Sequence, residues 1–420
     1  MKRIVLLVAA LFAATMPVAS AAGPVDITFL HAMPGPLGQA LKQIVDGFNA
    51  AQQEVRVRAE FAGNYDQLLQ KTMAQLAAGQ RPDLAQLEVS LVPRLAAGGH
   101  LLPLNPLLNM GNWQDFWPVF RRQATLASIG GTVWSIPFNN SDPVLYYNRS
   151  MFDEARIATP PATWDALLEA ARGLTQPGRV TGLGLILSDI WILEGTIWSA
   201  GGEVLSDDGQ HLLLDSPEAL RAVDYWARAV REGTARVYPD IQSWQADFAA
   251  GRVAMGFGSI VSWRFLQPQI RFPLSVARMP YISRPAVPVG GANLAIFKDI
   301  AADQRQATWQ FVEWLTEPAQ QARWAGLTGY LPVRRSATTN PQYAPLLNLP
   351  ATPSLKVGID QLPFARPRPT APGYVQVQSR CGTCWSRSCS RAPIRAAWCG
   401  RRWNAPTASL PRRRRGEACD

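Results

Sequence analysis

The first 380 residues of this 420-residue chain contain no cysteine, because all five cysteines lie between positions 381 and 419. Histidine is also scarce: His31, His100 and His211 are the only three, and they lie far apart in the chain. No zinc-protease, serine-hydrolase or nucleotide-binding motif is present. These absences disfavour a zinc site or a nucleophile–base pair. We therefore expect no catalytic residue, metal or cofactor, and an exported hydrolase is the less favoured alternative.

The net charge of +10 is concentrated at the C-terminus. Residues 380–420 contain ten arginines, no lysine and two acidic residues, whereas residues 22–379 contain 29 basic and 29 acidic residues. The body of the chain is therefore neutral. A neutral body gives no electrostatic reason to expect a nucleic-acid partner.

The N-terminus has the three parts of a secretion signal. Lys2 and Arg3 are followed by an apolar stretch over 4–14 and by the small residues 19–21 (ASA). The alternative, a membrane anchor, needs about 20 apolar residues, and this stretch is shorter. We predict a signal peptide over 1–21 and, because no cysteine follows it, a free periplasmic protein.

The composition changes abruptly near residue 380. Residues 380–420 are rich in Arg, Cys, Trp and Pro and have no helical or strand periodicity. Cys381 and Cys384 have the spacing of half a zinc site or a redox pair, but no histidine follows them. We interpret this tail as translated out of frame and assign it no function.

The body predicts a two-lobed α/β protein. Buried-strand patterns at 25–30, 55–61 and 84–87 alternate with helical patterns, which indicates a parallel sheet with ligand chemistry at the carboxyl ends of its strands. About 358 residues also exceed the size of a typical single core. The expected boundaries are 22–138 for lobe 1, 139–288 for the hinge and lobe 2, 289–325 for a return to lobe 1, and 326–379 for a return to lobe 2.

Five segments occur in the order and spacing of a known family. They are 29–33 (FLHAM), 63–65 (GNY), 137–148 (PFNNSDPVLYYN), 290–294 (GGANL) and 328–332 (TGYLP). Together they resemble the periplasmic sn-glycerol-3-phosphate-binding proteins of bacterial ABC importers, from about Ile27 to Val377. The resemblance implies a type II periplasmic-binding-protein fold that closes on a ligand between its lobes. It also implies partnership with two transmembrane permease subunits and a dimeric ATPase.

The resemblance carries over seven ligand-binding positions. They are Tyr65, Glu88, Ser141, Trp191, Ser259, Gly291 and Tyr330. On this hypothesis Glu88 accepts hydrogen bonds from glycerol hydroxyls, the hydroxyl side chains and the Gly291 N–H donate to phosphate oxygens, and Trp191 covers the carbon face. A lone tyrosine or tryptophan is otherwise often core or rim.

One departure from the family concerns its phosphate-binding arginine. At the expected register the chain has residues 373–376 (GYVQ), and Arg366 and Arg368 lie nearby but out of register. Arginine is the usual bidentate partner of phosphate. The resemblance implies capture of sn-glycerol-3-phosphate or a related glycerophosphodiester, and the missing arginine argues against a bound phosphate. The alternative is a neutral sugar or oligosaccharide, on which Tyr374 is suited to stack.

Overall fold

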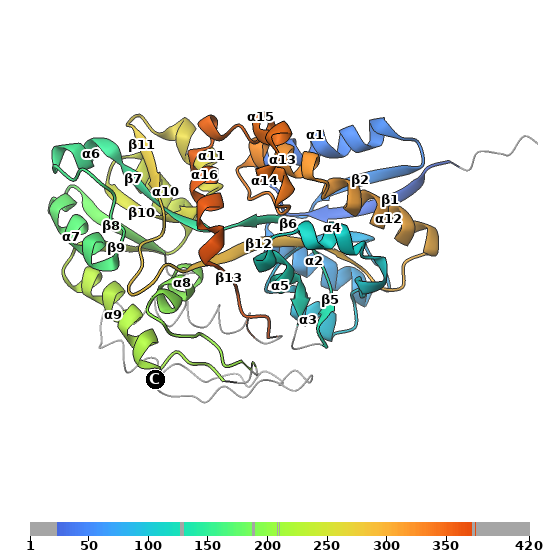
Figure 1. The fold of residues 1–420 in the computed structure, drawn as a ribbon, viewed down its shortest axis with the longest axis horizontal. Helices are drawn as coiled ribbons and strands as arrows, with labels where there is room; N and C mark the ends of the chain where they lie inside the picture. Colours follow the sequence, from blue (N-terminus) through green and yellow to red (C-terminus); the bar gives the residue numbers. More distant parts are fainter. Residues whose placement is uncertain are drawn as a thin grey trace, which may run out of the picture.

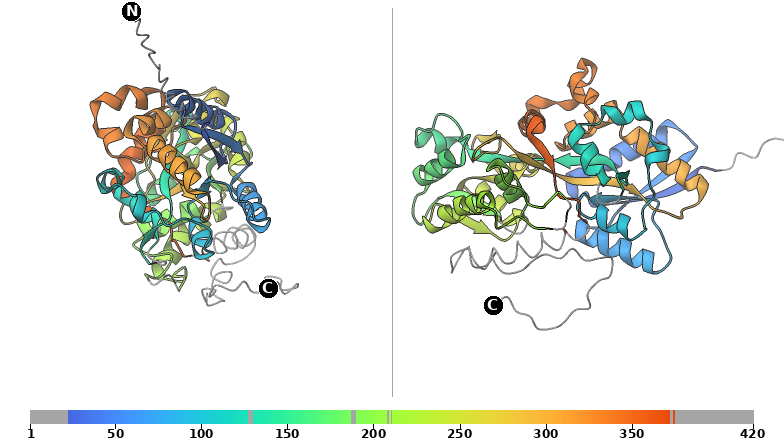
Figure 2. Two further views of the ribbon diagram at one scale, coloured as in Figure 1. Left: turned by 90° about the vertical axis from the view of Figure 1, so that its right-hand side faces the viewer. Right: turned by 60° about the horizontal axis from the view of Figure 1, so that its bottom comes forward.

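The computed structural model describes residues 23–126, 130–186, 190–207, 209, 211–371 and 374. The expected signal peptide (1–21) and the atypical tail (380–420) lie outside these residues. Within them the chain forms two α/β lobes that lie side by side (Figures 1 and 2). None of the described helices is long and apolar enough to cross a membrane.

The first lobe is built on a six-stranded sheet in the order β13-β12-β3-β1-β2, with β6 paired to β12. β1 pairs in parallel with both β2 and β3, as the alternating pattern predicts, and β12 returns antiparallel to β3. The strands are β1 (Val25–His31), β2 (Val55–Phe61), β3 (Leu84–Glu88), β6 (Ile136–Ser141), β12 (Val287–Ile296) and β13 (Ala365–Pro367).

The first helix of this lobe follows the expected apolar periodicity. In α1 (Gly35–Ala51), the residues Leu37, Leu41, Ile44, Val45 and Phe48 are all buried on one face. Further helices of this lobe are α2 (Tyr65–Ala77), α3 (Val92–Ala97), α4 (Met110–Asp115), α5 (Pro118–Ala124), α12 (Ala302–Leu315) and α13 (Pro318–Thr328). A small hairpin, β4 (Thr125–Leu126) and β5 (Thr132–Val133), completes the lobe.

The second lobe has a five-stranded sheet in the order β11-β7-β10-β8-β9. Its strands are β7 (Pro143–Asn148), β8 (Thr181–Ile186), β9 (Ala235–Tyr238), β10 (Val253–Ser259) and β11 (Leu274–Ala277). Its helices are α6 (Arg149–Glu154), α7 (Trp164–Leu174), α8 (Trp191–Ser199), α9 (Pro217–Arg231), α10 (Ile241–Ala249) and α11 (Ser262–Leu266). Trp164, Trp226 and Trp244 are fully buried in this lobe and belong to a hydrophobic core that continues into the first lobe.

The last part of the described chain does not follow the expected return to lobe 2 over 326–379. The helices α14 (Ser336–Thr339) and α15 (Ala344–Leu347) pack on α13 in the first lobe. Only α16 (Pro353–Gln361) reaches β7 and β11, and β13 then joins the first sheet beside β12. The error arose because the short helices 336–347 carry no periodicity that reveals their packing partner.

Three segments join the two lobes, and a glutamine side chain at the start of the third contacts the other two. The first crossing is at Asp142 between β6 and β7, the second lies between β11 and β12, and the third follows α16. The Gln361 amide donates to Asp142 Oδ2 (3.1 Å) and to the Pro143 carbonyl (3.0 Å), and its oxygen accepts from the Met279 N–H (2.7 Å). These buried hydrogen bonds hold the three crossings together and identify the hinge.

Candidate functional site

Glu88 ends β3 at the carboxyl edge of the first sheet, as expected for a ligand-binding carboxylate. Its Oε2 accepts from the Ser90 backbone N–H at 2.9 Å and also from the Ser90 hydroxyl. The side chain is 18 % exposed, and its Oε1 lies 3.9 Å from Arg368 Nη1. Ser90 therefore fixes the orientation of the carboxylate.

A buried chain of amides places Tyr65 beside this carboxylate. Gln86 accepts from the Ala32 N–H (2.8 Å) and donates to Asn139 Oδ1 (2.7 Å), and Asn139 in turn donates to the Tyr65 hydroxyl (3.1 Å). Asn139 belongs to the segment that carried the family resemblance but was not among the expected site residues. Gln86 was missed because a glutamine inside a strand has no distinctive pattern.

Tyr330 reaches the same place from the end of α13. Gly329 ends that helix with a left-handed φ of 85°, and the Tyr330 ring stacks on Trp324 with centroids 5.9 Å apart. Burial raises the pKa of both Tyr65 and Tyr330, and for Tyr65 the adjacent Tyr330 hydroxyl and Glu88 carboxylate act in the same direction. Both phenols therefore stay protonated and can donate hydrogen bonds.

Gly291 lies in β12 where the strand passes closest to Asn139. Its φ is +102°, and a Cβ there would come 2.1 Å from the Asn139 carbonyl oxygen. The neighbouring Ala292 is paired with Glu88, and the Gly291 carbonyl accepts from the Val89 N–H at 3.1 Å. Only glycine fits this backbone approach, which brings the Gly291 segment to the end of β3.

Gly291→Ala is expected to destabilise the protein by about 2 kcal/mol, because it adds steric overlap to backbone strain. Gly201→Ala is the matched control, since Gly201 has a similar φ of 97° but open space around its Cβ direction. We expect about 1 kcal/mol for the control. Urea unfolding of both variants measures the difference. Equal losses would show that the contact with Asn139 is unimportant.

The remaining expected positions lie around the junction of the lobes. Ser141 ends β6 opposite Gly290, and Trp191 begins α8 with its indole against Gly290, where a Cβ would come 3.2 Å from the ring. Ser259 ends β10 in the second sheet, and its hydroxyl accepts from the Val261 N–H at 3.2 Å. Gly329 lies against Val261, so the Ser259 and Tyr330 segments are neighbours. Six of the seven positions thus lie at or next to the ends of helices or strands, and Gly291 lies inside β12.

Arg368 also lies at this junction, although the sequence placed it out of register. Its Nε and Nη2 each donate to the Glu194 carboxylate at 2.9 Å, and the Tyr374 hydroxyl donates to the same carboxylate at 2.7 Å. Arg366 instead pairs with Glu203 and covers the Trp198 ring at 4.8 Å. Tyr374 is therefore buried in a polar cluster, which corrects the expectation that it offers a stacking surface.

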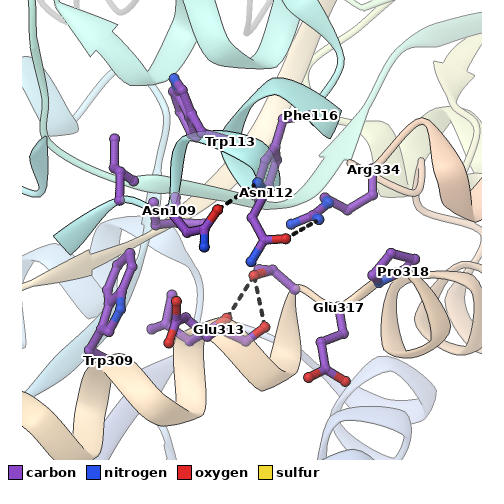
Figure 3. A pocket seen from close by; sticks show the side chains of 13 residues that line it. Asn109, Asn112, Trp113, Phe116, Trp309, Glu313, Glu317, Pro318 and Arg334 are labelled. Carbon is purple, nitrogen blue, oxygen red and sulfur yellow. Dashed lines mark hydrogen bonds between the residues drawn. The ribbon is translucent and has the colours of Figure 1, made fainter.

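A separate cavity of about 290 Å³ lies on the first lobe between α4 and α12. It is lined by Trp113, Trp309 and Glu313, and Figure 3 shows the Asn112 amide pointing at the Arg334 guanidinium beside it. None of the seven expected residues lines this cavity. Among the described residues, no group of three or more His, Cys, Asp or Glu is placed to hold a metal ion.

Comparisons with known proteins agree on the class of molecule. The family model described as bacterial extracellular solute-binding protein matches residues 43–351. The sn-glycerol-3-phosphate-binding periplasmic protein UgpB of Yersinia enterocolitica is 26% identical over 338 residues, which cover 76% of each chain. Its Escherichia coli counterpart is 24% identical over 337 residues, again 76% of each chain.

Two solved structures have the same two-lobed architecture. The cyclic alpha-maltosyl-1,6-maltose binding protein from Arthrobacter globiformis superposes with a TM-score of 0.78 at 25% identity, covering 89% of this chain and 96% of that one. UgpB from Mycobacterium tuberculosis, solved with glycerophosphocholine, superposes with a TM-score of 0.75 at 25% identity, covering 88% and 98%.

Proposed function

This chain belongs to the bacterial extracellular solute-binding protein family, and from that membership we propose that it captures sn-glycerol-3-phosphate or a glycerophosphodiester for an ABC importer. The curated relatives are named for sn-glycerol-3-phosphate, and one structural neighbour holds glycerophosphocholine. Relatives of this kind are binding proteins and not enzymes. We place the protein in the periplasm, where it would deliver its solute to two permease subunits driven by a dimeric ATPase.

The observation that carries this proposal is the meeting of one carboxylate and two protonated phenols at the lobe junction. Glu88 is held by Ser90 and can accept hydrogen bonds from a pair of hydroxyls. Tyr65 and Tyr330, whose pKa values are raised, can donate to phosphate or ether oxygens. Trp191, packed on Gly290, offers a ring that can cover a carbon backbone.

A second candidate is a neutral oligosaccharide. It is favoured by the carboxylate pairing of Arg368, since a guanidinium already bonded to Glu194 is less available to an anion. A structural neighbour is named for a cyclic maltosyl sugar. The two candidates share the Glu88 and tyrosine contacts and differ in whether a phosphate is bound.

A thermal-shift screen tests these candidates directly. The probes are glycerol-3-phosphate, glycerophosphocholine, maltose and trehalose, each added to the purified protein. A ligand at a hundred times its Kd raises the free energy of unfolding by about 2.7 kcal/mol. We expect the largest rise in melting temperature with a phosphate-bearing glycerol compound.

A matched variant makes the screen specific for the site. Tyr330→Phe removes one proposed donor and keeps the ring stacked on Trp324. The shift should shrink in this variant if Tyr330 contacts the solute. A response to the disaccharides alone would contradict the glycerol-phosphate proposal and leave the sugar alternative.

A further inference from the structure

Two buried side-chain amides, Gln86 and Asn139, connect the backbone at the end of β1 with the hydroxyl of Tyr65. Both side chains belong to fully buried residues, each 0 % exposed. Gln86 Oε1 accepts from the Ala32 N–H (2.8 Å), and Gln86 Nε2 donates to Asn139 Oδ1 (2.7 Å). Asn139 Nδ2 then donates to the Tyr65 hydroxyl oxygen (3.1 Å). We refer to Gln86 and Asn139 together as the amide relay.

The direction of the hydrogen bonds in the amide relay is fixed at its first step. A backbone N–H is always a donor, so the oxygen of Gln86 must face Ala32 and its NH₂ group must face Asn139. The oxygen of Asn139 must then face Gln86, which turns the NH₂ group of Asn139 to Tyr65. Rotating either amide by half a turn would set like groups against each other inside the protein, where an unmade hydrogen bond is costly.

The amide relay determines which atom Tyr65 offers to a solute. Because the Tyr65 oxygen accepts from Asn139, its hydrogen points away from the relay, toward the Tyr330 hydroxyl or a bound solute. Burial raises the pKa of Tyr65, so this hydrogen stays in place at physiological pH. A phenol without such a neighbour can present either its hydrogen or its oxygen. The relay removes the second possibility.

We propose that Gln86 and Asn139 are positioning residues that fix Tyr65 as a hydrogen-bond donor, so that the solute atom lying against Tyr65 must be an acceptor oxygen. The inference rests on the proposed function and adds the residues that set the donor and acceptor pattern of its site. Gln86 acts through Asn139, and Asn139 acts through Tyr65.

A double-mutant cycle tests the amide relay on the full chain. Gln86→Met keeps the length of the side chain and removes its hydrogen bonds, so the Asn139 amide is no longer held in one orientation. By calorimetry we expect the Kd of glycerophosphocholine to rise about fivefold. Tyr65→Phe removes the donor itself and should raise the Kd about tenfold. In the Tyr65→Phe background, Gln86→Met should change the Kd by less than about 1.5-fold, because no hydroxyl remains to be oriented.

Gln123→Met is the matched control for loss of a buried glutamine. Gln123 is 2 % exposed and makes its own pair of hydrogen bonds in the first lobe, donating to the Val289 carbonyl (3.1 Å) and accepting from Asn140 (3.0 Å). This variant should lower the melting temperature as Gln86→Met does, but keep the Kd within about twofold of wild type. An equal rise in Kd in both variants would mean that binding responds to stability alone and would contradict the inference.

Gln86→Glu supplies a second test in which the relay is reversed and then restored. The ionised carboxylate accepts from the Ala32 N–H and also turns an acceptor to Asn139, which favours rotation of the Asn139 amide so that its oxygen accepts from Tyr65. The protonated carboxyl donates to Asn139 as Gln86 does. Burial raises the pKa of the introduced carboxyl above its usual range. We therefore expect a Kd within about twofold of wild type at pH 5 and about tenfold above it at pH 8.

The ratio to wild type at each pH removes the contribution of the titratable groups around the relay, which both proteins share. These groups are His31, Glu88, Tyr65 and Tyr330. In the Tyr65→Phe background the rise at pH 8 should disappear, whereas plain repulsion between the new charge and the phosphate would persist. Should Gln86→Met fail to fold, the pH 5 and pH 8 values of Gln86→Glu still decide.

Failure of the relay and failure of the proposed function give different results. A rise in Kd on Gln86→Met that is equally large in the Tyr65→Phe background, or absent from both backgrounds, would refute the relay and leave the proposed function intact. No binding of glycerophosphocholine by the wild-type protein would instead contradict the proposed function, and the inference with it.

Discussion

Replacing Glu88 with glutamine is expected to weaken glycerophosphocholine binding about 30- to 100-fold. A hydrogen bond to a charged group contributes about 1.5–3 kcal/mol, and glutamine loses that charge. Ser90 determines which end of the glutamine amide faces the solute, because the Ser90 N–H and hydroxyl both donate to the Oε2 position of residue 88. In the variant the amide oxygen must take that place, so an NH₂ group faces the solute where an acceptor is needed.

Trp191→Phe is the comparison variant for this experiment. Phenylalanine keeps a ring against Gly290 and loses only part of the covering surface, so a loss of about threefold is expected. Isothermal calorimetry on both variants, with circular dichroism to check folding, gives the two Kd values. Small and equal losses would mean that Glu88 does not contact the solute.

The elements that position Glu88 were predictable because they depend on local patterns. The strand 84–87 and the helical spacing from Leu37 to Phe48 are visible in the order of apolar residues. Ligand positions such as Tyr65 and Gly291 came from the resemblance and not from periodicity. Their placement around one junction depends on β12 returning antiparallel to β3, which no local pattern indicates.

The cluster of Arg368, Glu194 and Tyr374 shows why other contacts at the lobe junction could not be predicted from the sequence. Glu194 and Arg368 are 174 residues apart, and neither lies in a motif that signals a partner. Comparison with the family register led to the conclusion that the arginine was out of place, whereas the three-dimensional structure brings its side chain to Glu88. Tyr374 was misinterpreted for the same reason, since its burial depends on this distant carboxylate.

The hinge contains another pair of residues that are distant in the sequence, Asp142 and Gln361, and burial makes ionisation of Asp142 unfavourable. Asp142 is fully buried between β6 and β7 and accepts from Gln361 Nε2, which is 219 residues away. Burial raises the pKa of Asp142 to about 7, although the hydrogen bond from Gln361 acts in the opposite direction. The carboxyl group is therefore protonated in the folded protein at mildly acidic pH and must ionise inside the hinge above pH 7.

This raised pKa predicts that Asp142 lowers stability as the pH rises. Between the unfolded pKa of 3.8 and the folded pKa of about 7, the folded state binds the extra proton, so the free energy of unfolding falls across that window. A shift of about three units corresponds to roughly 4 kcal/mol, all of it lost by about pH 8. Asp142→Asn removes this loss, and its stability relative to wild type should therefore rise by a similar amount from pH 4 to pH 8.

Urea unfolding of Asp142→Asn and wild type at pH 4, 6 and 8 measures the effect, and Asp115→Asn provides a control whose titration lies below this pH range. Burial raises the pKa of Asp115, but hydrogen bonds from Ser336 and Arg334 outweigh it and leave the pKa lowered. Wild-type Asp115 therefore loses stability only on acidification below its unfolded pKa of 3.8, so the stability of Asp115→Asn relative to wild type should stay nearly constant from pH 4 to pH 8. Parallel pH curves for Asp142→Asn and wild type would mean that the hinge carboxyl titrates normally and places no charge penalty on the crossing between the lobes.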